Sequence, residues 1–489
     1  MKVRTRLAPS PTGYLHLGSL HTFLYNYYFT KKNGGEMVLR VEDTDRTRYV
    51  EGAIEALIAI LDRMGISYDE GPMLENGKIV QKGSHGPYIQ SERLEIYREH
   101  AKKLIDVGHA YYCFCSKERL STVREEQQKL KRPTKYDRTC LALPKEEIEK
   151  RVMAGESHVI RMQIPEGKTT FVDEIRGEIT IDNSEMDDQV ILKADGFPTY
   201  HLAVVVDDFS MEITHIIRAE EWISSVPKHL ILYEWFGYPI PSYAHLPLIL
   251  NPDKSKLSKR QGDVSVESYL EKGFLKEALL NFIAILGFNP SGDQEIYTQE
   301  ELMHAFEIKK VSKSGPIFDV NKLLWMNGQY IKALSTKELV SRVKPFLDGE
   351  GQTISDELLG RICDVEKTRM SILSEINELS SCYRKLGEYS VESLVWKKSS
   401  REDAHLQLSE IHTFLSSLSP EIFEKIELLE EGIKRYIEET GKETGNVLWP
   451  LRVSLSGKEK SASPFELAWV IGREETLSRI LHATALLSA

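Results

Sequence analysis

The stretch LAPSPTGYLHLGSLHTFLYN, residues 7–26, constrains the fold more than any other feature of the sequence. A short apolar run ends in a turn shaped by Pro9, Pro11 and Gly13, and an apolar helical pattern follows at once. A second short run, EMVLRVEDTD, comes after a Gly-Gly pair. Strand, helix and strand in this order predict a βαβ opening, and therefore an α/β domain of the doubly wound type.

The remaining pattern predicts one interruption of the α/β order and then a helical second half. EGAIEALIAILDRMG is an amphipathic helix with a glycine stop, and SERLEIYREHAKKLIDVG is a helix with Ser91 as its N-cap. Residues 111–195 hold clustered cysteines and short β-like runs such as SHVIRMQI and EITIDN, which indicates an insertion. GFPTYHLAVVVDDFSMEITHIIRAEEW predicts an apolar strand followed by a polar loop, and nearly everything after Val264 predicts helix.

The composition is that of a globular protein with room for roughly three or four domains, since the chain has 489 residues. No apolar run approaches the ~18 residues of a membrane span, and the start MKVRTRLAPS has no apolar signal segment, so we expect a cytoplasmic protein without a membrane partner. Five cysteines are too few for a disulfide scaffold. The net charge of −11 excludes a surface that coats nucleic acid indiscriminately but allows local basic stripes.

Two motifs far apart in the sequence carry the residue types that bind phosphate. The helix that begins near Gly18 is expected to offer free amides and the positive end of its dipole, and His16 can donate a hydrogen bond. In KLSKR, Lys256 and Lys259 stand three apart in a polar loop and can clamp growing negative charge. Each motif alone is equally typical of a tight corner with a capping histidine or of a solvated loop, and neither GxxxxGK(S/T) nor GxGxxG is present at a strand–helix junction.

The HLGS corner and the KLSKR loop resemble the two signature motifs of class I aminoacyl-tRNA synthetases. Longer segments in the same order resemble those of bacterial glutamyl-tRNA synthetases: RLAPSPTGYLHLGSLHTFLYNY, LRVEDTDRTR, GPYIQSER, DGFPTYHLA, IRAEEW, KGFLKEALLNFIAILGF, GPIFDVNKLLWMNGQYI and LWPLRVSLSG. The resemblance covers almost the whole chain, so chance agreement is negligible.

This resemblance implies an α/β fold with a class I Rossmann-like catalytic domain, an inserted acceptor-binding α+β domain, and all-α stem-contact and anticodon-binding domains. The expected boundaries are 1–110 and 196–263 for the two halves of the catalytic domain, 111–195 for the insertion, 264–330 for the stem-contact domain and 331–489 for the anticodon-binding domain.

The activity implied by the resemblance is that of a glutamate–tRNA ligase, whose partners are L-glutamate, ATP with Mg²⁺ and tRNA(Glu). Glutamate joins the α-phosphate of ATP, pyrophosphate leaves, and the glutamyl group passes to the 3′-terminal adenosine of the tRNA. Catalysis of this kind needs positioning and charge stabilisation rather than a covalent nucleophile. The catalytic residues implied are His16, Gly18, Ser19, Lys256 and Lys259, and the ATP-binding residues are His16, Gly18, Trp222 and Lys259.

The resemblance also assigns a glutamate site to Arg6, Ala8, Ser10, Glu42, Tyr200 and Arg218. Arginine binds a carboxylate with a planar fork, and we expect Arg218 to take chiefly the side-chain carboxylate with Arg6 sharing it. Glu42 is the partner expected for the α-amino group. Both arginines could equally form surface salt bridges, and only their motif positions favour the site. Val204 follows YHLA where the family usually has asparagine, so one polar contact to the amino acid is missing or replaced.

Three cysteines cluster within or near the insertion: Cys113, Cys115 and Cys140. Thiolates are good zinc ligands, but zinc prefers four ligands. Many relatives have a histidine two residues after the last cysteine, where this chain has Ala142. Tyr136 matches a tyrosine ligand of a truncated relative, the glutamyl-queuosine tRNA synthetase. We therefore expect a structural zinc held by the three cysteines and Tyr136, with three buried free thiols as the alternative.

In the helical half, Cys363 and Cys382 are expected to be packing residues, and Arg369 lies where relatives place an arginine near the third anticodon base. A solvated helix charge is the alternative for Arg369.

The family implies a monomer. An enzyme that also charges tRNA(Gln) is the nearest alternative function. A tRNA-binding paralogue without ligase activity is disfavoured by the intact HLGS and KLSKR motifs, and a small nucleotidylyltransferase by the helical half.

Overall fold

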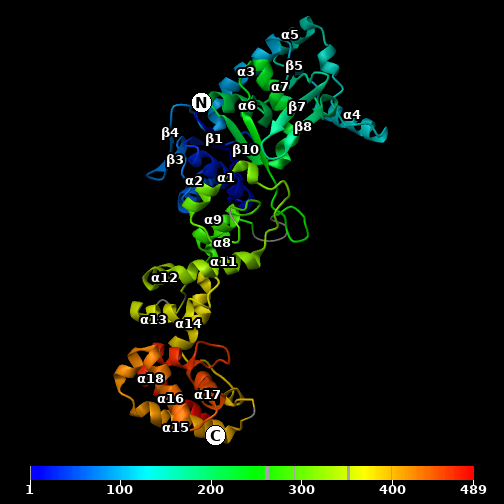
Figure 1. Ribbon diagram of the computed structural model, residues 1–489. Helices are drawn as coiled ribbons and strands as arrows, with labels where there is room; N and C mark the ends of the chain where they lie inside the picture. The colour runs from blue at the N-terminus through cyan, green and yellow to red at the C-terminus, as the bar shows by residue number, and fades with distance from the viewer. Residues whose placement is uncertain are drawn as a thin grey trace. The chain divides into compact units, whose positions relative to one another are not determined.

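The computed structural model describes residues 2–258, 264–290, 292–347, 349, 353–397 and 399–488. The chain divides into two compact units (Figure 1). The first comprises the residues up to Tyr269 together with Leu279–Asp319, and the second comprises Leu270–Ala278 together with the residues from Val320 onward. The first unit is mixed α/β and the second is helical, as the sequence predicts.

The first unit begins with the predicted βαβ arrangement. Strand β1 (Arg4–Leu7) pairs in parallel with β2 (Glu36–Leu39), and helix α1 (Leu17–Lys32) connects them. All four residues of β1 are buried, and α1 buries residues along most of its length. The predicted βαβ opening is therefore confirmed.

A four-stranded sheet lies beside β1, with two strands from the predicted second half of the catalytic domain and two from residues 111–195, the predicted insertion. Strands β10 (His215–Ala219) and β11 (Ser242–Leu246) are parallel, β7 (Lys168–Asp173) pairs in parallel with β11, and β8 (Gly177–Asp182) is antiparallel to β7. The backbone N–H of Thr214 donates to the carbonyl of Arg4 at 3.0 Å, which joins the two halves next to β1. Two segments 210 residues apart in the sequence thus share one core.

Helix α6 (Tyr200–Ser210) occupies the segment for which the sequence predicts an apolar strand, so that prediction is wrong. Its residues 202–206 are all at most 1% exposed and pack with α3 (Leu94–Asp106) and α7 (Val226–Phe236). A helix buried on nearly every side has no polar face to reveal its period, and an apolar run then looks the same as a buried strand. The strand itself comes later, as β10.

The N-cap predicted for α3 is also wrong. Ser91 lies inside a 3-10 turn (Gln90–Arg93) that leads into the helix, and no side chain caps α3. The backbone N–H of Ser91 donates instead to Asp43 Oδ1 at 2.8 Å. The entry to the helix is fixed by a residue 48 positions earlier, which no local pattern indicates.

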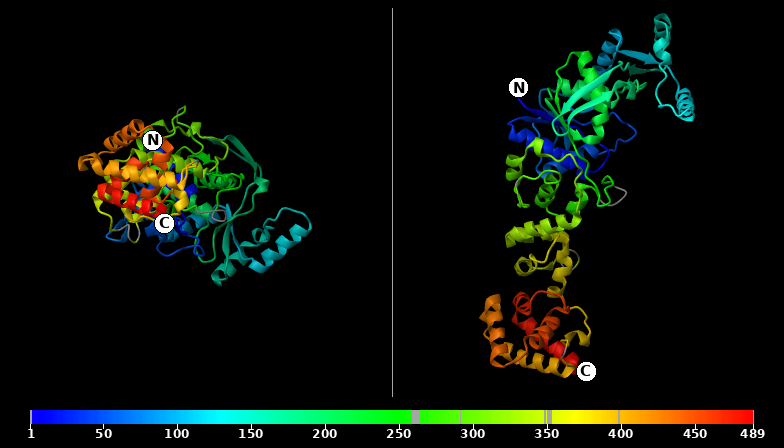
Figure 2. Two further views of the ribbon diagram at one scale, coloured as in Figure 1. Left: turned by 90° about the horizontal axis from the view of Figure 1, so that it is seen from below. Right: turned by 45° about the vertical axis from the view of Figure 1, so that its right-hand side comes forward.

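The inserted segment builds a small antiparallel sheet with two helices. Strands β5 (Ala110–Cys113), β6 (Val159–Met162) and β9 (Val190–Leu192) form the sheet, and β6 and β8 are the two predicted β-like runs. Helices α4 (Lys117–Lys129) and α5 (Lys145–Met153) bury none of their residues. Figures 1 and 2 show α4, in cyan, extending from the body of the first unit.

The other helices and strands of the first unit surround these sheets, and α8 and α9 contribute residues to both units. They are α2 (Ala53–Met64), β3 (Gly71–Glu75), β4 (Lys78–Lys82), α8 (Val266–Glu271), α9 (Lys276–Ala284) and α10 (Gln299–Ala305).

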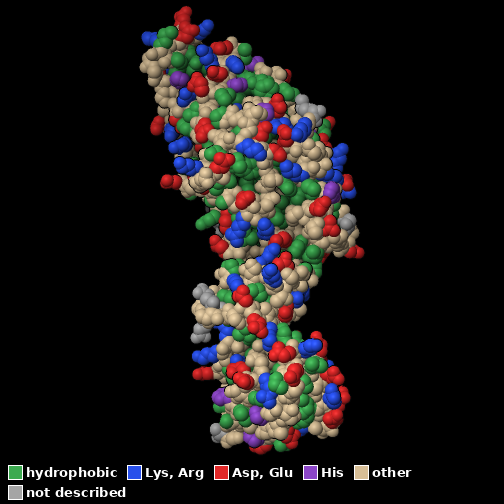
Figure 3. Space-filling model, turned by 90° about the vertical axis from the view of Figure 1, so that its left-hand side faces the viewer, with side chains coloured by type: hydrophobic (Ala, Val, Ile, Leu, Met, Phe, Trp, Pro, Cys, Tyr) green, Lys and Arg blue, Asp and Glu red, His purple; other side chains and the backbone are tan. Residues whose placement is uncertain are grey.

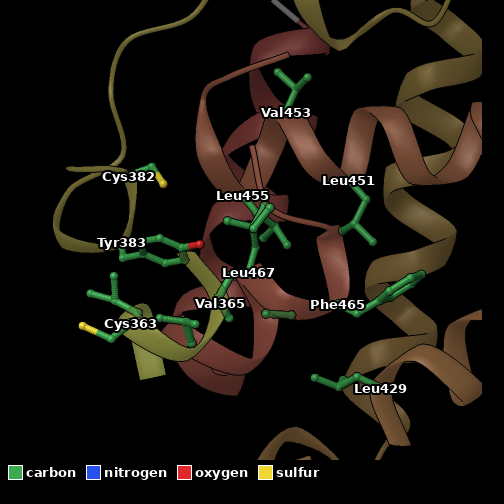
Figure 4. Packing of buried hydrophobic residues seen from close by; sticks show 14 of the residues in the cluster. Cys363, Val365, Cys382, Tyr383, Leu429, Leu451, Val453, Leu455, Phe465 and Leu467 are labelled. Atoms are coloured by element: carbon green, nitrogen blue, oxygen red, sulfur yellow. The ribbon is translucent and has the colours of Figure 1, made fainter. Parts of the chain in front are cut away.

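The second unit consists of helices packed around one apolar core. These are α11 (Val320–Ala333), α12 (Thr336–Val343), α13 (Asp356–Glu366), α14 (Ile376–Arg384), α15 (Arg401–Ser417), α16 (Ile426–Glu439), α17 (Thr444–Ser456) and α18 (Pro464–Ser488). Figure 4 shows Cys363 and Cys382 among the side chains of this core. Burial raises the pKa of both thiols, that of Cys363 to about 12. Both cysteines are packing residues, as predicted.

The surface carries charges of both signs. Figure 3 shows Lys and Arg side chains interspersed with Asp and Glu over the face that it draws. Within the described part of the chain, no helix combines the length and the apolar character that crossing a membrane requires.

Candidate active site

A cavity of about 750 Å³ opens in the first unit, where its parallel strands end. Strands β1 and β2 are parallel, as are β10 and β11, and residues at the carboxyl ends of both pairs line the cavity. Ligands of open α/β sheets bind at such an edge. The lining includes these predicted site residues: Arg6, Ala8, Ser10, His16, Gly18, Ser19, Glu42, Tyr200, Arg218, Trp222 and Lys256.

His16 is the N-cap residue of α1 and lines the cavity. Its Nδ1 accepts the backbone N–H of Gly18 at 2.9 Å, so a neutral ring carries its proton on Nε2. A Cβ added at Gly18 would lie 3.2 Å from that Nδ1, and glycine therefore leaves room for the close contact. Nε2 is the atom through which His16 can donate to a ligand.

The expectation of free amides at the start of α1 is wrong. The N–H of Leu17 donates to the carbonyl of Val264 at 2.9 Å, that of Gly18 to the His16 ring, and that of Ser19 to the His16 carbonyl at 2.9 Å. The first amides of a helix need partners outside its own ladder, and here the chain supplies them. The dipole of the 16-residue helix remains directed at the cavity.

Of the two predicted lysines, Lys256 lies within the residues that the structure describes. Its backbone bridges to Leu250, which places the start of the KLSKR loop at the cavity, and its ammonium pairs with the carboxylate of Glu221. Both side chains are about half exposed. An exposed pair is worth only about 0–1 kcal/mol, so the ammonium can exchange Glu221 for a phosphate. Lys259 lies outside the described residues.

Arg218 lies in β10, and each nitrogen of its guanidinium donates one hydrogen bond. Nη1 donates to Tyr200 Oη at 2.6 Å, Nη2 to the carbonyl of Trp222 at 3.2 Å, and Nε to Nε2 of His245 at 3.1 Å. These bonds to described residues use three of the five N–H groups and leave one on each Nη for a carboxylate. Burial raises the pKa of Tyr200, so its phenol stays neutral and can itself donate.

Arg6 and Glu42 belong to one buried ion network. Arg6 Nε donates to Asp208 Oδ1 at 3.2 Å, and Arg40 donates to the same oxygen at 2.7 Å. Arg40 also donates to Glu42 Oε1 at 3.1 Å. None of these four side chains is more than 10% exposed. Burial raises the pKa of Glu42, and the charges of Arg40 and Arg6 offset only part of that rise.

Arg40, Asp208 and His245 are not among the predicted site residues, although each contacts one of them. A signal was present, since all three interrupt apolar runs: VLRVE, VVVDDF and YAHLPL. Buried charges are found almost only with partners, so such interruptions indicate a polar network inside the fold.

The turn after β1 carries Ala8 and Ser10, both at the cavity, with the carbonyl of Ser10 accepting the N–H of Thr12 at 2.9 Å. The ring of Trp222 lies 4.5 Å, centroid to centroid, from that of Tyr200 and is 38% exposed. Val204 is 1% exposed in the apolar cluster of α6, and the described lining of the cavity does not include it.

The three predicted cysteine ligands form a cluster in the inserted segment. The sulfurs of Cys113, Cys115 and Cys140 all lie within 4.8 Å of one another. Tyr136 Oη lies 3.3 Å from Cys115 Sγ and accepts the N–H of Cys140 at 3.0 Å, so the phenol oxygen is next to the sulfurs. Three thiols and one phenol are a donor set that could hold a metal ion.

Arg369 belongs to the second unit and is one-third exposed. Its Nη1 lies 3.4 Å from Glu366 Oε2, a buried carboxylate that also accepts the phenol of Tyr383 at 2.6 Å. Arg369 therefore lies at the surface, and the buried carboxylate of Glu366 partly balances its positive charge.

Two family models match the chain. The catalytic domain of class I tRNA synthetases (E and Q) matches residues 2–325, and an anticodon binding domain matches residues 338–484. The chain therefore belongs to the class I aminoacyl-tRNA synthetases, and the predicted fold class is confirmed. Members of this class use ATP with Mg²⁺.

Comparison with curated relatives and solved structures identifies the group within this class to which the chain belongs. The chain is 45% identical over 489 residues to glutamate–tRNA ligase of Alkaliphilus metalliredigens, with 98% of each chain covered. It is 45% identical over 495 residues to that of Clostridioides difficile, with 99% of each covered. A crystal structure of a glutamate tRNA ligase from Elizabethkingia meningosepticum in complex with its amino acid matches with a TM-score of 0.90 at 35% identity, covering all of both chains. Within its class, the chain belongs to the glutamate–tRNA ligases.

Proposed function

We propose that this chain activates L-glutamate with ATP, releases pyrophosphate, and transfers the glutamyl group to the 3′-terminal adenosine of tRNA(Glu). The observation that carries this proposal is that one cavity of the first unit brings both sets of groups together. It collects two buried arginines and a buried carboxylate together with the helix-start histidine and the KLSKR lysine. The first set suits an amino acid with two carboxylates, and the second suits a phosphate chain.

On this proposal Arg218 binds the side-chain carboxylate through the N–H that remains on each Nη, and Arg6 adds a second positive charge. The α-ammonium group of glutamate pairs with Glu42, and the Tyr200 hydroxyl donates to the substrate. Every group that Arg218 presents is a donor. The NH₂ of glutamine would meet a donor where glutamate offers an acceptor, which costs about 1–3 kcal/mol for the buried group left unpaired. Ala8 and Ser10 contribute small contacts from the turn after β1.

ATP lies on the other side of the cavity on this proposal. The Nε2–H of His16 donates to a phosphate oxygen, Gly18 and Ser19 keep the helix start close to the phosphates, and Lys256 and Lys259 act from the opposite side. Trp222 borders the adenine. Mg²⁺ bound to ATP supplies charge neutralisation of the phosphates. No side chain becomes covalently attached, so these groups act by aligning glutamate with the α-phosphate and by stabilising charge as pyrophosphate leaves.

The second unit binds the tRNA on this proposal, with Arg369 near the third anticodon base, and the protein acts as a monomer. The domain boundaries expected from the sequence belong to the same proposal. Arg369 suits RNA because an exposed guanidinium can leave a partial ion pair for a phosphate or a base edge.

A structural zinc held by Cys113, Cys115, Cys140 and Tyr136 completes the proposal. Three thiolates and a phenolate provide four ligands of the kinds zinc accepts, and the phenol oxygen already lies beside the sulfurs. Zinc there would stabilise the inserted segment, where α4 and α5 bury no residue of their own.

Aminoacylation tests the proposal directly. Purified protein is given labelled glutamate, ATP and either tRNA(Glu) or tRNA(Gln), and ATP–pyrophosphate exchange is measured with and without tRNA. We expect charging of tRNA(Glu) and exchange that requires tRNA. Charging of both tRNAs identifies a non-discriminating enzyme. Exchange with a different amino acid, while no tRNA accepts glutamate, overturns the proposal.

A further inference from the structure

Three neighbouring strands each carry one residue of a polar group: Arg218 in β10, His245 in β11 and Asp173 in β7. In the parallel pair of β10 and β11, Arg218 lies opposite His245. Strand β7 joins β11 on its other side, with Asp173 opposite Tyr243. Paired residues of adjacent strands share a face of the sheet, and so does His245, two residues after the Tyr243 that pairs with Asp173. The register therefore brings together residues 27 and 72 positions apart.

These three side chains form one hydrogen-bond chain. Arg218 Nε–H donates to His245 Nε2 at 3.1 Å, and His245 Nδ1–H donates to Asp173 Oδ2 at 2.6 Å. The other oxygen of Asp173 accepts the backbone N–H groups of Ile175 and Arg176 at 3.0 and 2.9 Å. Arg218 is 5% exposed, and the other two side chains are at most 1% exposed.

The chemistry of the chain fixes the tautomer of His245. A guanidinium only donates, so Nε2 must be the acceptor and the ring proton must lie on Nδ1. Burial lowers the pKa of His245 and the charge of Arg218 assists, while Asp173 opposes, which keeps the ring neutral. Burial alone would raise the pKa of Asp173, but hydrogen bonds from His245 and the two backbone amides hold it below its usual range.

We propose that Asp173 and His245 are positioning residues that aim the guanidinium of Arg218 at the side-chain carboxylate of the amino acid. This inference rests on the proposed role of Arg218. With Nε held by His245, only the Nη edge faces the substrate. The bonds of Nη1 and Nη2 to Tyr200 and Trp222 stop rotation of the guanidinium in its plane. The N–H left on each Nη then forms a fixed fork that matches the two oxygens of a carboxylate.

Asp173→Asn is the most direct test because the neighbouring hydrogen-bond donors allow only one orientation of the new side-chain amide. Two backbone amides require an acceptor at Oδ1, so the new NH₂ group must face His245. His245 must then accept at Nδ1 and carry its proton on Nε2. Two donors, the Nε2–H of His245 and the Nε–H of Arg218, then face each other, and their hydrogen bond is lost. We expect the KM for glutamate to rise about tenfold or more, with a much smaller change in the KM for ATP.

Two substitutions of His245 separate positioning from packing. Glutamine at 245 can place an acceptor near the former Nε2 and keep the bond to Arg218, but leaves Asp173 without a side-chain donor. Asparagine can keep the bond to Asp173 but leaves the Arg218 Nε–H without an acceptor. Each loses one buried hydrogen bond, so we expect similar melting temperatures. We expect the KM for glutamate to rise about tenfold for His245→Asn and less than about threefold for His245→Gln.

Asp182→Asn is the matched control. Asp182 lies at the end of β8 in the same hairpin and accepts the backbone N–H of Ser184 at 2.9 Å, away from the cavity. We expect unchanged kinetics for it. If Asp173→Asn behaves like this control while Arg218→Lys raises the KM for glutamate, the positioning role is overturned and the role of Arg218 stands. If Arg218→Lys also leaves that KM unchanged, the proposed role of Arg218 fails with it. Equal KM values for the two His245 variants also overturn the positioning role.

Discussion

Replacing Asp208 by asparagine perturbs the buried ion network with almost no change of shape. Asp208 Oδ1 accepts from Arg40 Nη1 at 2.7 Å and from Arg6 Nε at 3.2 Å. Arg6, Arg40 and Arg93 balance Asp208, Asp207 and Glu42, so the substitution leaves one buried positive charge in excess. Removing one partner of a buried ion pair costs about 3–5 kcal/mol. The loss should lie toward the lower end of that range, because Arg40 keeps Glu42 as a partner at 3.1 Å.

The expected loss of about 3 kcal/mol is large enough to measure by thermal unfolding. At about 2 °C per kcal/mol for a unit of this size, the transition of the first unit falls by about 6 °C. Arg6 loses the carboxylate that holds its Nε, so we also expect the KM for glutamate to rise about tenfold while the KM for ATP changes little. The melting temperature is measured by calorimetry and the two KM values by aminoacylation kinetics, on the same protein preparation.

Glu234→Gln is the control for the lost negative charge. Glu234 is exposed on α7, the helix that packs on α6, and its side chain lies outside the cavity. We expect wild-type melting and kinetics for this variant. Melting of Asp208→Asn within about 1 °C of the control, together with an unchanged KM for glutamate, would refute the reasoning that this network holds Arg6 in place.

Three further results are expected. His16→Asn keeps an acceptor for the N–H of Gly18, so it should melt like the wild type yet lower the rate of pyrophosphate exchange about 100-fold or more; a rate within about threefold of wild type contradicts donation from Nε2. Hydrogen bonds from Tyr88, His85 and Arg4 outweigh burial and lower the pKa of Glu70 to about 2, below its usual 4.5. The carboxylate thus contributes about 1–2 kcal/mol above pH 4.5, after a discount for solvent screening, that is lost as the pH falls toward 2, and Glu70→Gln should flatten this acid limb in a pH series of denaturant unfolding. Elemental analysis should find one zinc per chain, none in Cys115→Ser and weakened retention against a chelator in Tyr136→Phe; zinc-free wild type would end that proposal.

Local sequence patterns predicted the elements whose signals are themselves local. The corner before α1, the glycine stop of α2 and the β-like runs of the insertion all lie where the pattern indicates them. Helix α6 was mispredicted because its residues are buried on nearly every side, and the apolar run then carries no period. The start of α3 was mispredicted because Asp43, far away in sequence, satisfies the amide of Ser91.

The lining of the cavity was predictable from motif positions, but the partners of the lining residues were not. Arg6 depends on Asp208, 202 residues later, and Arg218 depends on His245 in the next strand. Such pairs are set by strand register and helix packing, which a sequence without its fold does not specify.

The residues that hold the site in place nevertheless share a recognisable property. Arg40, Asp208 and His245 are buried and each interrupts a run of apolar residues, and Asp173 is buried at the end of β7. A charged or imidazole group in such a position is costly without a partner, so each interruption implies another one elsewhere in the core. The arginines of these networks are four, Arg6, Arg40, Arg93 and Arg218, and they match four carboxylates, Glu42, Asp173, Asp207 and Asp208, while His245 is neutral. The charges therefore balance only when Arg6 and Arg218, which line the cavity, are counted with the others. Charge balance thus links the interior of the fold to the two arginines at the cavity.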